Sequence, residues 1–246
     1  IARMEDRYFQ TNIIDFSETK HNKSTYSIFG GSIVLEGSTL NARQFATQGS
    51  REKMAAQIFT GTEHFRSGAS KVTKDTPEPY KKVQSWLQVS YQNETYHKVS
   101  PKFTLGAYLE AYYSSRNFSN NYTATLMQAG EFTPTAHSKV TYNEAFRANQ
   151  YAGVGAIPIY QLSESFQLRG EFYGFVPIFP IKKDEYGQAY YGKAFTKFEY
   201  LGEISLVFQL SFGSISAYVN HYSSPSNDWN VGLTLGWQLF NSRFIE

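Results

Sequence analysis

The sequence predicts an all-β protein, an antiparallel transmembrane β-barrel, and three observations lead to that prediction. Among 246 residues there are 19 Tyr and 20 Phe but three Met and no Cys, a composition that suits pleated sheets. The last strand, Asp228–Phe240, alternates between an apolar face, with Trp229 and Trp237 near its ends, and a face of small and polar residues. Short turns also alternate with longer loops along the chain, as they do in outer-membrane barrels.

Composition and charge narrow the classes of protein that remain. No apolar run approaches the roughly 18 residues that a helical membrane span requires. A mean hydropathy of −0.44 still fits a barrel, because lipid-facing and lumen-facing residues alternate along each strand. The absence of Cys excludes disulfides and thiolate metal sites, and a net charge of +2 is too small to indicate a nucleic-acid partner. Because the chain begins at Ile1 without a signal peptide, we expect a processed form or a part of a longer protein.

In the first half of the chain we expect six strands, separated by polar segments or by segments with Gly and Pro. The clearest is Phe103–Tyr113, in which apolar residues occupy alternate positions. Its opposite face holds Glu110, a charge that requires a water-filled lumen or an ion-pair partner. The six expected strands are Ile1–Phe16, Thr25–Glu36, Glu52–Phe65, Val83–Val99, Phe103–Tyr113 and Tyr122–Phe132.

The second half is more regular. A short turn at Ser163–Ser165 joins one pair of strands, and a tight turn at Gly213 joins another, whereas the connections Phe179–Thr196 and Ser223–Asn227 are longer. The strands expected here are Gln150–Leu162, Phe166–Ile178, Ile204–Phe212, Ser214–Tyr222 and Asp228–Phe240.

The order of short and long connections predicts which side of the membrane each one faces. If the C-terminus is periplasmic, the short turns are periplasmic and the loop Arg66–Lys82 is extracellular. This assignment is consistent only if one more crossing lies between Phe132 and Asn149. We therefore predict a twelfth strand near Ser138–Phe146. The turns expected on the periplasmic side are Leu40–Ser50, Ser100–Pro101, Ser163–Ser165 and Gly213.

Three stretches carry a resemblance to a known family: Leu40–Ser50, Phe146–Tyr151 and the closing strand pair Ser214–Tyr222 and Trp229–Phe240. Through them the chain resembles the C-terminal outer-membrane β-barrel of patatin-like phospholipases. Those barrels belong to the surface-antigen superfamily, which also holds the barrel-assembly and two-partner-secretion transporters. The resemblance covers essentially the whole chain and places residues 1–246 in one barrel domain without a catalytic domain.

This resemblance has consequences for the rest of the protein. In that family a patatin lipase domain and a small periplasmic domain precede the barrel, which has more than twelve strands, so the chain is expected to be the C-terminal portion of a larger barrel. A complete twelve-stranded barrel is the alternative, because twelve strands can close. The implied location is the outer membrane of a Gram-negative bacterium. The implied partners are membrane lipid, an upstream patatin-like domain in the same polypeptide and the barrel-assembly machinery.

We expect no catalytic residue, cofactor or metal site in this chain. Patatin-type hydrolysis needs a nucleophilic Ser on a Gly-x-Ser-x-Gly elbow and an Asp followed by Gly. The nearest string, Gly30–Val34, lacks the second Gly and lies within a predicted strand, so Ser32 is not a candidate nucleophile, and no Asp precedes a Gly. The five His residues have no metal-ligand spacing and are expected in loops or in the lumen: His21, His64, His97, His137 and His221.

Three functions fit these observations. The first is a membrane anchor, and an export conduit, for an upstream lipid hydrolase. The second is a stand-alone outer-membrane channel or transporter, which predicts ion conductance in bilayers. The third is a soluble β-barrel that binds an apolar ligand and stays in solution without detergent.

One candidate contact lies inside the predicted barrel. On Phe166–Ile178 the alternation places Arg169 and Glu171 together on the lumen face, where Glu171 needs a partner. The superfamily tucks a loop into its barrel through an Arg-Gly-aromatic motif that meets an acidic group on the wall. Arg147, in the matching place along the chain, is therefore the expected partner of Glu171, although Ala148 replaces the Gly. The alternative is that Arg169 neutralises Glu171 and that Arg147 is a loop charge.

Overall fold

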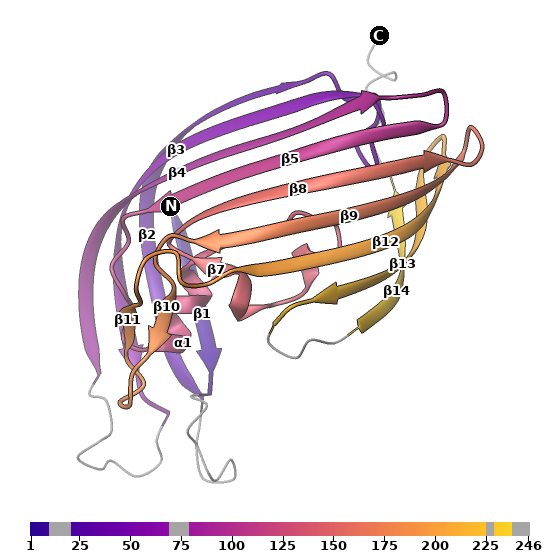
Figure 1. Ribbon diagram of the computed structural model, residues 1–246. Coiled ribbons are helices and arrows are strands. Elements are labelled where there is room, and N and C mark those ends of the chain that lie inside the picture. The colour runs from indigo at the N-terminus through magenta and orange to yellow at the C-terminus, as the bar shows by residue number, and fades with distance from the viewer. Residues whose placement is uncertain (10–20, 69–78, 225–228, 238–246) are drawn as a thin grey trace.

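The computed structural model describes residues 1–9, 21–68, 79–224 and 229–237, and ten of its strands form one strongly curved antiparallel sheet (Figure 1). Each strand pairs with the next one of the sheet along the chain, so the sheet is an up-and-down meander. The strands are β1 (Ala2–Tyr8), β2 (Asn22–Ser38), β3 (Gly49–Arg66), β4 (Tyr80–Lys98), β5 (Phe103–Ser114), β8 (Gln150–Gln161), β9 (Phe166–Pro177), β12 (Glu199–Leu210), β13 (Gly213–Tyr222) and β14 (Trp229–Trp237).

The two faces of the sheet have opposite chemistry. Along β12, Tyr200, Ile204 and Leu206 are exposed on the convex face, whereas Glu203 and Ser205 are buried on the concave face. The same alternation holds in β5 and β9, as the sequence predicts. Exposed large apolar residues on the convex face include Phe29, Ile33, Leu35, Met54, Ile58, Val83, Leu87, Val89, Leu105, Leu109, Val154, Leu168, Phe172, Ile215, Val231, Leu233 and Leu235.

Two of the predicted crossings are wrong. Tyr122–Phe132 is not a strand, because Tyr122–Gln128 forms the short helix α1. Asn121 caps the start of this helix, since its side chain accepts a hydrogen bond from the backbone N–H of Ala124 at 2.9 Å. The expected strand at Ser138–Phe146 is replaced by two 3₁₀ turns, η1 (Ser138–Val140) and η2 (Glu144–Phe146).

Strand β5 pairs directly with β8, so the part of the chain that the structure describes has ten strands in this sheet and not about twelve. The sequence predicts two more crossings than the structure shows. Because two is an even number, the other connections still lie at the predicted ends of the sheet. The loop 39–48 and the turns 99–102, 162–165 and 211–212 lie at one end of the sheet. The connections 67–79, 115–149, 178–198 and 223–228 join strands at the other. We call these the short-turn end and the long-connection end.

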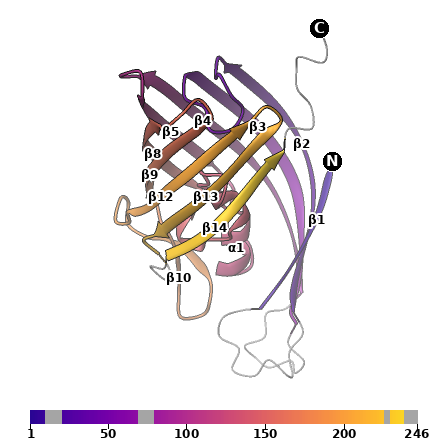
Figure 2. The same cartoon turned by 90° about the vertical axis from the view of Figure 1, so that its right-hand side faces the viewer.

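The sheet is open in the described part of the chain. Strands β1 and β14 are its two edges, and no backbone pairing joins them there (Figure 2). Residues 10–16 of the first expected strand, and residues 228 and 238–240 of the last, lie outside the described residues. Of the helices described, none is long and apolar enough to cross a membrane.

Residues 115–149, here called the inner segment, lie inside the curve of the sheet and contact both of its edges (Figures 1 and 2). At the β1 edge, Asn121 donates to the hydroxyl of Tyr8 at 2.8 Å and Gln128 donates to Asp6 at 2.7 Å. At the β14 edge, a ring nitrogen of His137 lies 2.5 Å from the hydroxyl of Thr234. The inner segment also contains a short two-stranded sheet, formed by β6 (Gly130–Glu131) and β7 (Arg147–Ala148). A second short pair, β10 (Ile181–Lys183) and β11 (Ala189–Tyr191), lies in the connection between β9 and β12.

Phe132 anchors the inner segment to the wall. Its ring is 2% exposed and lies against the rings of Tyr108, Tyr151, Tyr173 and Phe175, with centroids 5.5 to 6.3 Å apart. This contact requires a glycine on β8, because a Cβ at Gly153 would lie 2.1 Å from a Phe132 ring carbon. The aromatic cluster therefore depends on a missing side chain.

We predict that Gly153→Ala destabilises the folded protein by about 1–3 kcal/mol, because the new methyl group displaces the Phe132 ring. The matched control is Gly31→Ala on β2, where a Cβ meets nothing within 4 Å and the stability should hold or rise slightly. Urea unfolding in detergent micelles measures both. Equal stability of the two variants would contradict the proposed packing.

Candidate functional site

The concave side of the sheet holds most of the buried polar chemistry of the described residues. Two parts of the chain fill it, the inner segment and the loop 39–48 that joins β2 to β3 at the short-turn end. The site is therefore the interface between this wall and the two segments that lie on it.

Arg169 connects the wall to the loop 39–48. It is 4% exposed, and its Nε donates to Oε1 of Glu171 at 2.5 Å, while its Nη1 donates to the carbonyl of Ala46 at 2.9 Å. The Nη2 atom donates to the hydroxyl of Tyr96 at 2.7 Å. The other oxygen of Glu171 accepts from Tyr173 at 2.8 Å. Both charged groups are thus fully engaged, as a buried ion pair must be.

Side chains from three strands hold the backbone of this loop. Gln167 on β9 and Gln209 on β12 donate to the carbonyl of Phe45 at 3.2 and 3.1 Å. Ser214 on β13 donates to the Gln44 side chain at 2.8 Å. Phe45 has a φ of 53°, in the left-handed region, and this turn presents its carbonyl to the wall. Hydrogen bonds to the wall therefore hold the loop 39–48 in a defined position in the interior.

His137 ties the inner segment to the last three strands. Its Nδ1 lies 2.8 Å from Oε2 of Glu203 on β12, and its Nε2 lies 2.5 Å from Thr234 on β14. The imidazole stacks on the ring of Tyr218 on β13, with centroids 3.3 Å apart. Asn220 donates to the same Glu203 oxygen at 3.5 Å. His137 is 5% exposed, so it acts as a buried connector between segments far apart in the sequence.

Arg147 does not meet Glu171, so the expected contact is wrong. Its Nη2 lies 2.7 Å from Glu131, and its Nη1 faces the carbonyls of Leu126, Met127 and Ala129 at 3.3 to 3.5 Å, at the C-terminus of α1. The guanidinium also lies over the ring of Tyr142. A cation is favourable there because the last carbonyls of a helix have no partner within it. The alternative, Arg169 as the partner of Glu171, is the arrangement found.

A second arginine buries its charge against the wall at the other edge. Arg116 lies over the rings of Tyr26 and Trp86, at 5.2 and 4.6 Å, and donates to Gln128 at 2.8 Å. Burial lowers the pKa of the Arg116 guanidinium, and the nearby Tyr26 and Glu63 oppose that shift. Arg116 therefore fixes the start of the inner segment on β2 and β4.

A cavity of about 300 Å³ remains between the loop 39–48, the inner segment and the wall. Arg169, Glu171 and Thr234 line it, together with three more cations and a second carboxylate: Arg43, Arg51, Lys139 and Glu94. The described residues contain no group of three His, Cys, Asp or Glu side chains that could hold a metal ion. The cavity is thus polar, and more cations than carboxylates line it.

The other residues singled out in the sequence lie apart from this cavity. Ser32 is in the middle of β2, exposed and opposite Gln57 of β3, so it is part of a regular ladder. His64, His97 and His221 lie in strands and face the convex side, so the prediction of a loop or the lumen is wrong for these three. His137 was expected in a loop or in the lumen, and the structure places it on the concave side.

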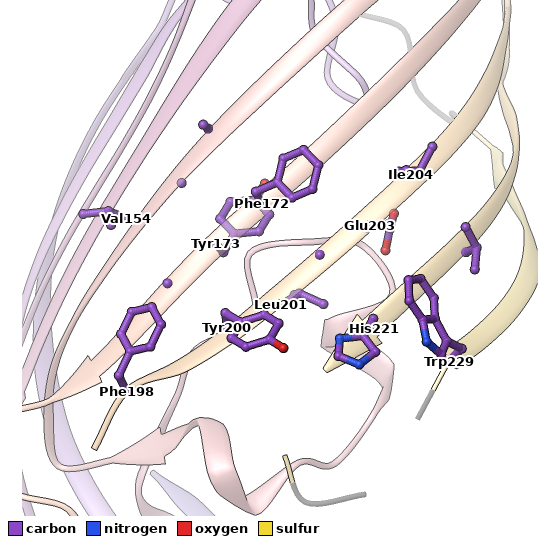
Figure 3. Close-up of a pocket in the computed structure, with 15 residues that line it drawn as sticks. Val154, Phe172, Tyr173, Phe198, Tyr200, Leu201, Glu203, Ile204, His221 and Trp229 are labelled. Atoms are coloured by element: carbon purple, nitrogen blue, oxygen red, sulfur yellow. The ribbon is translucent and has the colours of Figure 1, made fainter. Parts of the chain in front are cut away.

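The convex face has a groove of its own. It has a volume of about 700 Å³ and runs across β8, β9, β12, β13 and β14 (Figure 3). Phe198, Tyr200, His221 and Trp229 line it toward the long-connection end, and Val154, Phe172 and Ile204 line the remainder. At the short-turn end of the same face, Phe166 and Phe208 stack with centroids 4.5 Å apart. Aromatic rings thus lie at both ends of an aliphatic surface.

Comparisons with protein-family models, with curated proteins and with solved structures found no match for this chain.

We predict that the buried pair is energetically coupled and that Arg147 is independent of it. Arg169→Ala and Glu171→Ala should each lower the free energy of unfolding by roughly 3–5 kcal/mol, because each leaves a buried charge without its partner. The double variant should cost less than the sum. Arg147→Ala combined with Glu171→Ala should be additive, because the two residues share no partner. Urea unfolding of all variants gives both cycles, and coupling in the second cycle alone would overturn this assignment.

Proposed function

We propose that this chain is an outer-membrane β-barrel domain that anchors an upstream patatin-like lipid hydrolase. The observation that carries the membrane part is the polarity of the sheet, with apolar side chains exposed on the convex face and charged side chains buried on the concave face. In a soluble barrel the exposed face is polar. Here Leu233 and Leu235 are each 79% exposed. Exposure of such apolar side chains is unfavourable in water and favourable in the hydrocarbon layer of a membrane.

The positions of the aromatic rings support the same proposal. Trp229 and Tyr200 lie toward the long-connection end of the convex face, and Phe166, Phe208 and Phe212 lie at the short-turn end. Transmembrane barrels carry such rings at both interfaces between hydrocarbon and water. The aliphatic surface between them on β12 includes Ile204 and Leu206.

The filled interior favours an anchor over the alternatives. A stand-alone channel needs a continuous water path, whereas the inner segment and the loop 39–48 lie across the concave side and bond to its wall. A soluble carrier of apolar ligands needs an apolar interior, whereas Glu203 and the Arg169–Glu171 pair lie inside. The hydrolase part rests on the resemblance of Leu40–Ser50 and of Phe146–Tyr151 to the patatin-like family.

We predict that a cation on the convex face blocks insertion and that one on the concave face does not. Val89 and Gln88 are neighbours at the middle of β4 and point to opposite sides. Val89→Arg should cost roughly 2–4 kcal/mol in a bilayer, because it places a charge in hydrocarbon, and Gln88→Arg should have a small effect. Insertion into phosphatidylcholine vesicles, followed by protection from protease, measures both. Equal insertion of the two variants would rule out the membrane proposal.

The enzymatic part has a separate test. The polypeptide encoded upstream of Ile1 should contain a Gly-x-Ser-x-Gly elbow, and phospholipase activity of the full protein should sediment with the outer membrane. Replacing the elbow Ser by Ala should abolish activity and leave insertion unchanged. An upstream region without such an elbow would contradict the anchor assignment while leaving the barrel assignment intact.

A further inference from the structure

A polar recess of about 680 Å³ lies on the convex face where β1 to β4 reach the long-connection end. It is distinct from the interior cavity and from the aromatic groove, which lies on β8 to β14. The concave positions of the same strands, such as Tyr8, Tyr26 and Phe65, are buried under the inner segment. The recess is lined by Arg3, Lys23, Thr25, Ser27, His64, Phe65, Arg66, Pro79, Tyr80 and Lys81.

The register of the four strands brings these cations together. Lys23 is the cross-strand partner of Arg66, and His64 is the partner of Lys81. Side chains at such positions are about 5 Å apart at Cβ, so the charges of Lys23 and Arg66 repel each other. A cluster of this kind is stabilised when an anion lies among its members.

The acidic groups nearby do not supply that anion. Glu5, the acidic residue of β1 on this face, already pairs with Lys23 at 2.6 Å and with Arg7 at 2.8 Å. Among the described residues, no carboxylate lies within 4.0 Å of the charged nitrogens of Arg3, Arg66 or Lys81. Three cations from three different strands are thus free to bind one external anion.

An apolar recess continues the basic one toward the middle of the strands. It has a volume of about 280 Å³, shares Ser27 with the basic recess, and is lined by Ile28, Phe29 and Val83. Phe29 and Val83 are 63% and 66% exposed. The combined surface is amphipathic, with a cationic part next to the long-connection end and an apolar part nearer the middle of the strands.

We propose that this surface binds a lipid with a phosphate group in its head, with the phosphate in the basic recess and an acyl chain on the apolar one. A phosphate oxygen pair matches the fork of an arginine, which Arg3 and Arg66 provide, and Lys81 adds a point charge. The proposal rests on the membrane placement above, because only an inserted sheet meets lipid at this level. It differs from unspecific attraction of cations to a membrane surface, which needs neither a phosphate nor a recess.

The test uses the whole chain folded in neutral detergent and three probes: dioleoyl phosphatidic acid, dioleoylglycerol and inorganic phosphate. Native mass spectrometry measures their binding. Phosphatidic acid should bind at least about tenfold more tightly than each of the other two, because they lack the phosphate or the acyl chains. Equal binding of dioleoylglycerol would overturn the proposal, and equal binding of inorganic phosphate would reduce the site to a simple anion site and overturn the lipid assignment.

Two variants locate the site. Arg66→Gln combined with Lys81→Gln should weaken phosphatidic acid binding about tenfold or more. The matched control, Lys182→Gln with Lys193→Gln, removes the same charge from the connection between β9 and β12 and should leave binding unchanged. Equal losses in both would indicate unspecific attraction and contradict the proposal.

A third variant keeps the proposal testable if the first one does not fold. Ser27→Glu leaves every cation in place but adds a carboxylate opposite Arg3, so it should also weaken binding. Insertion of the unchanged chain into phosphatidylcholine vesicles is recorded first. Failure to insert contradicts the proposed function, whereas insertion without a preference for phosphatidic acid contradicts only the lipid site.

Discussion

Hydrogen bonds join the inner segment to both edge strands of the curved sheet. Asn121 and Gln128 bond to β1, and His137 bonds to β14, so one stretch of chain spans the concave side from edge to edge. Each bond contributes only about 0.5–1.5 kcal/mol, but together they fix the separation of two strands that do not pair with each other. Side-chain hydrogen bonds thus connect the two edge strands through the interior, whereas in a closed barrel backbone hydrogen bonds join the edge strands directly.

The same interior explains why charged residues are placed in pairs and networks. Glu203 and Glu171 are both buried. Glu203 is partnered by His137 of the inner segment, whereas Glu171 is partnered by Arg169 of its own strand, which in turn donates to Ala46 in the loop 39–48. Because a buried charge without a partner is costly, Glu203 favours the inner segment against the wall, and the Arg169–Glu171 pair favours the loop 39–48 there. The loop 39–48 and the inner segment are therefore positioned by the wall.

Much of the fold could be predicted from the sequence, because alternation is a local signal. Both faces of Phe103–Tyr113 and Phe166–Ile178 are as expected, and so is the sorting of short and long connections. The prediction is wrong at Tyr122–Phe132, although Asn121 ahead of a run with Ala, Leu, Met and Gln is a helix-start signal. The contact of His137 with Glu203 joins residues 66 positions apart, and no periodicity reports such a distance.

The unequal lengths of the strands give the molecule a high side and a low side. Strands β2, β3 and β4 have 17, 18 and 19 residues, whereas β13 has 10. At roughly 3.3 Å per residue, the difference of seven to nine residues corresponds to about 23 to 30 Å along the strands. The rim of the sheet is therefore slanted, and anything that approaches it meets the projecting strands on the β2–β4 side and open space on the β13 side. Strand length alone thus makes the two sides of the rim unequal.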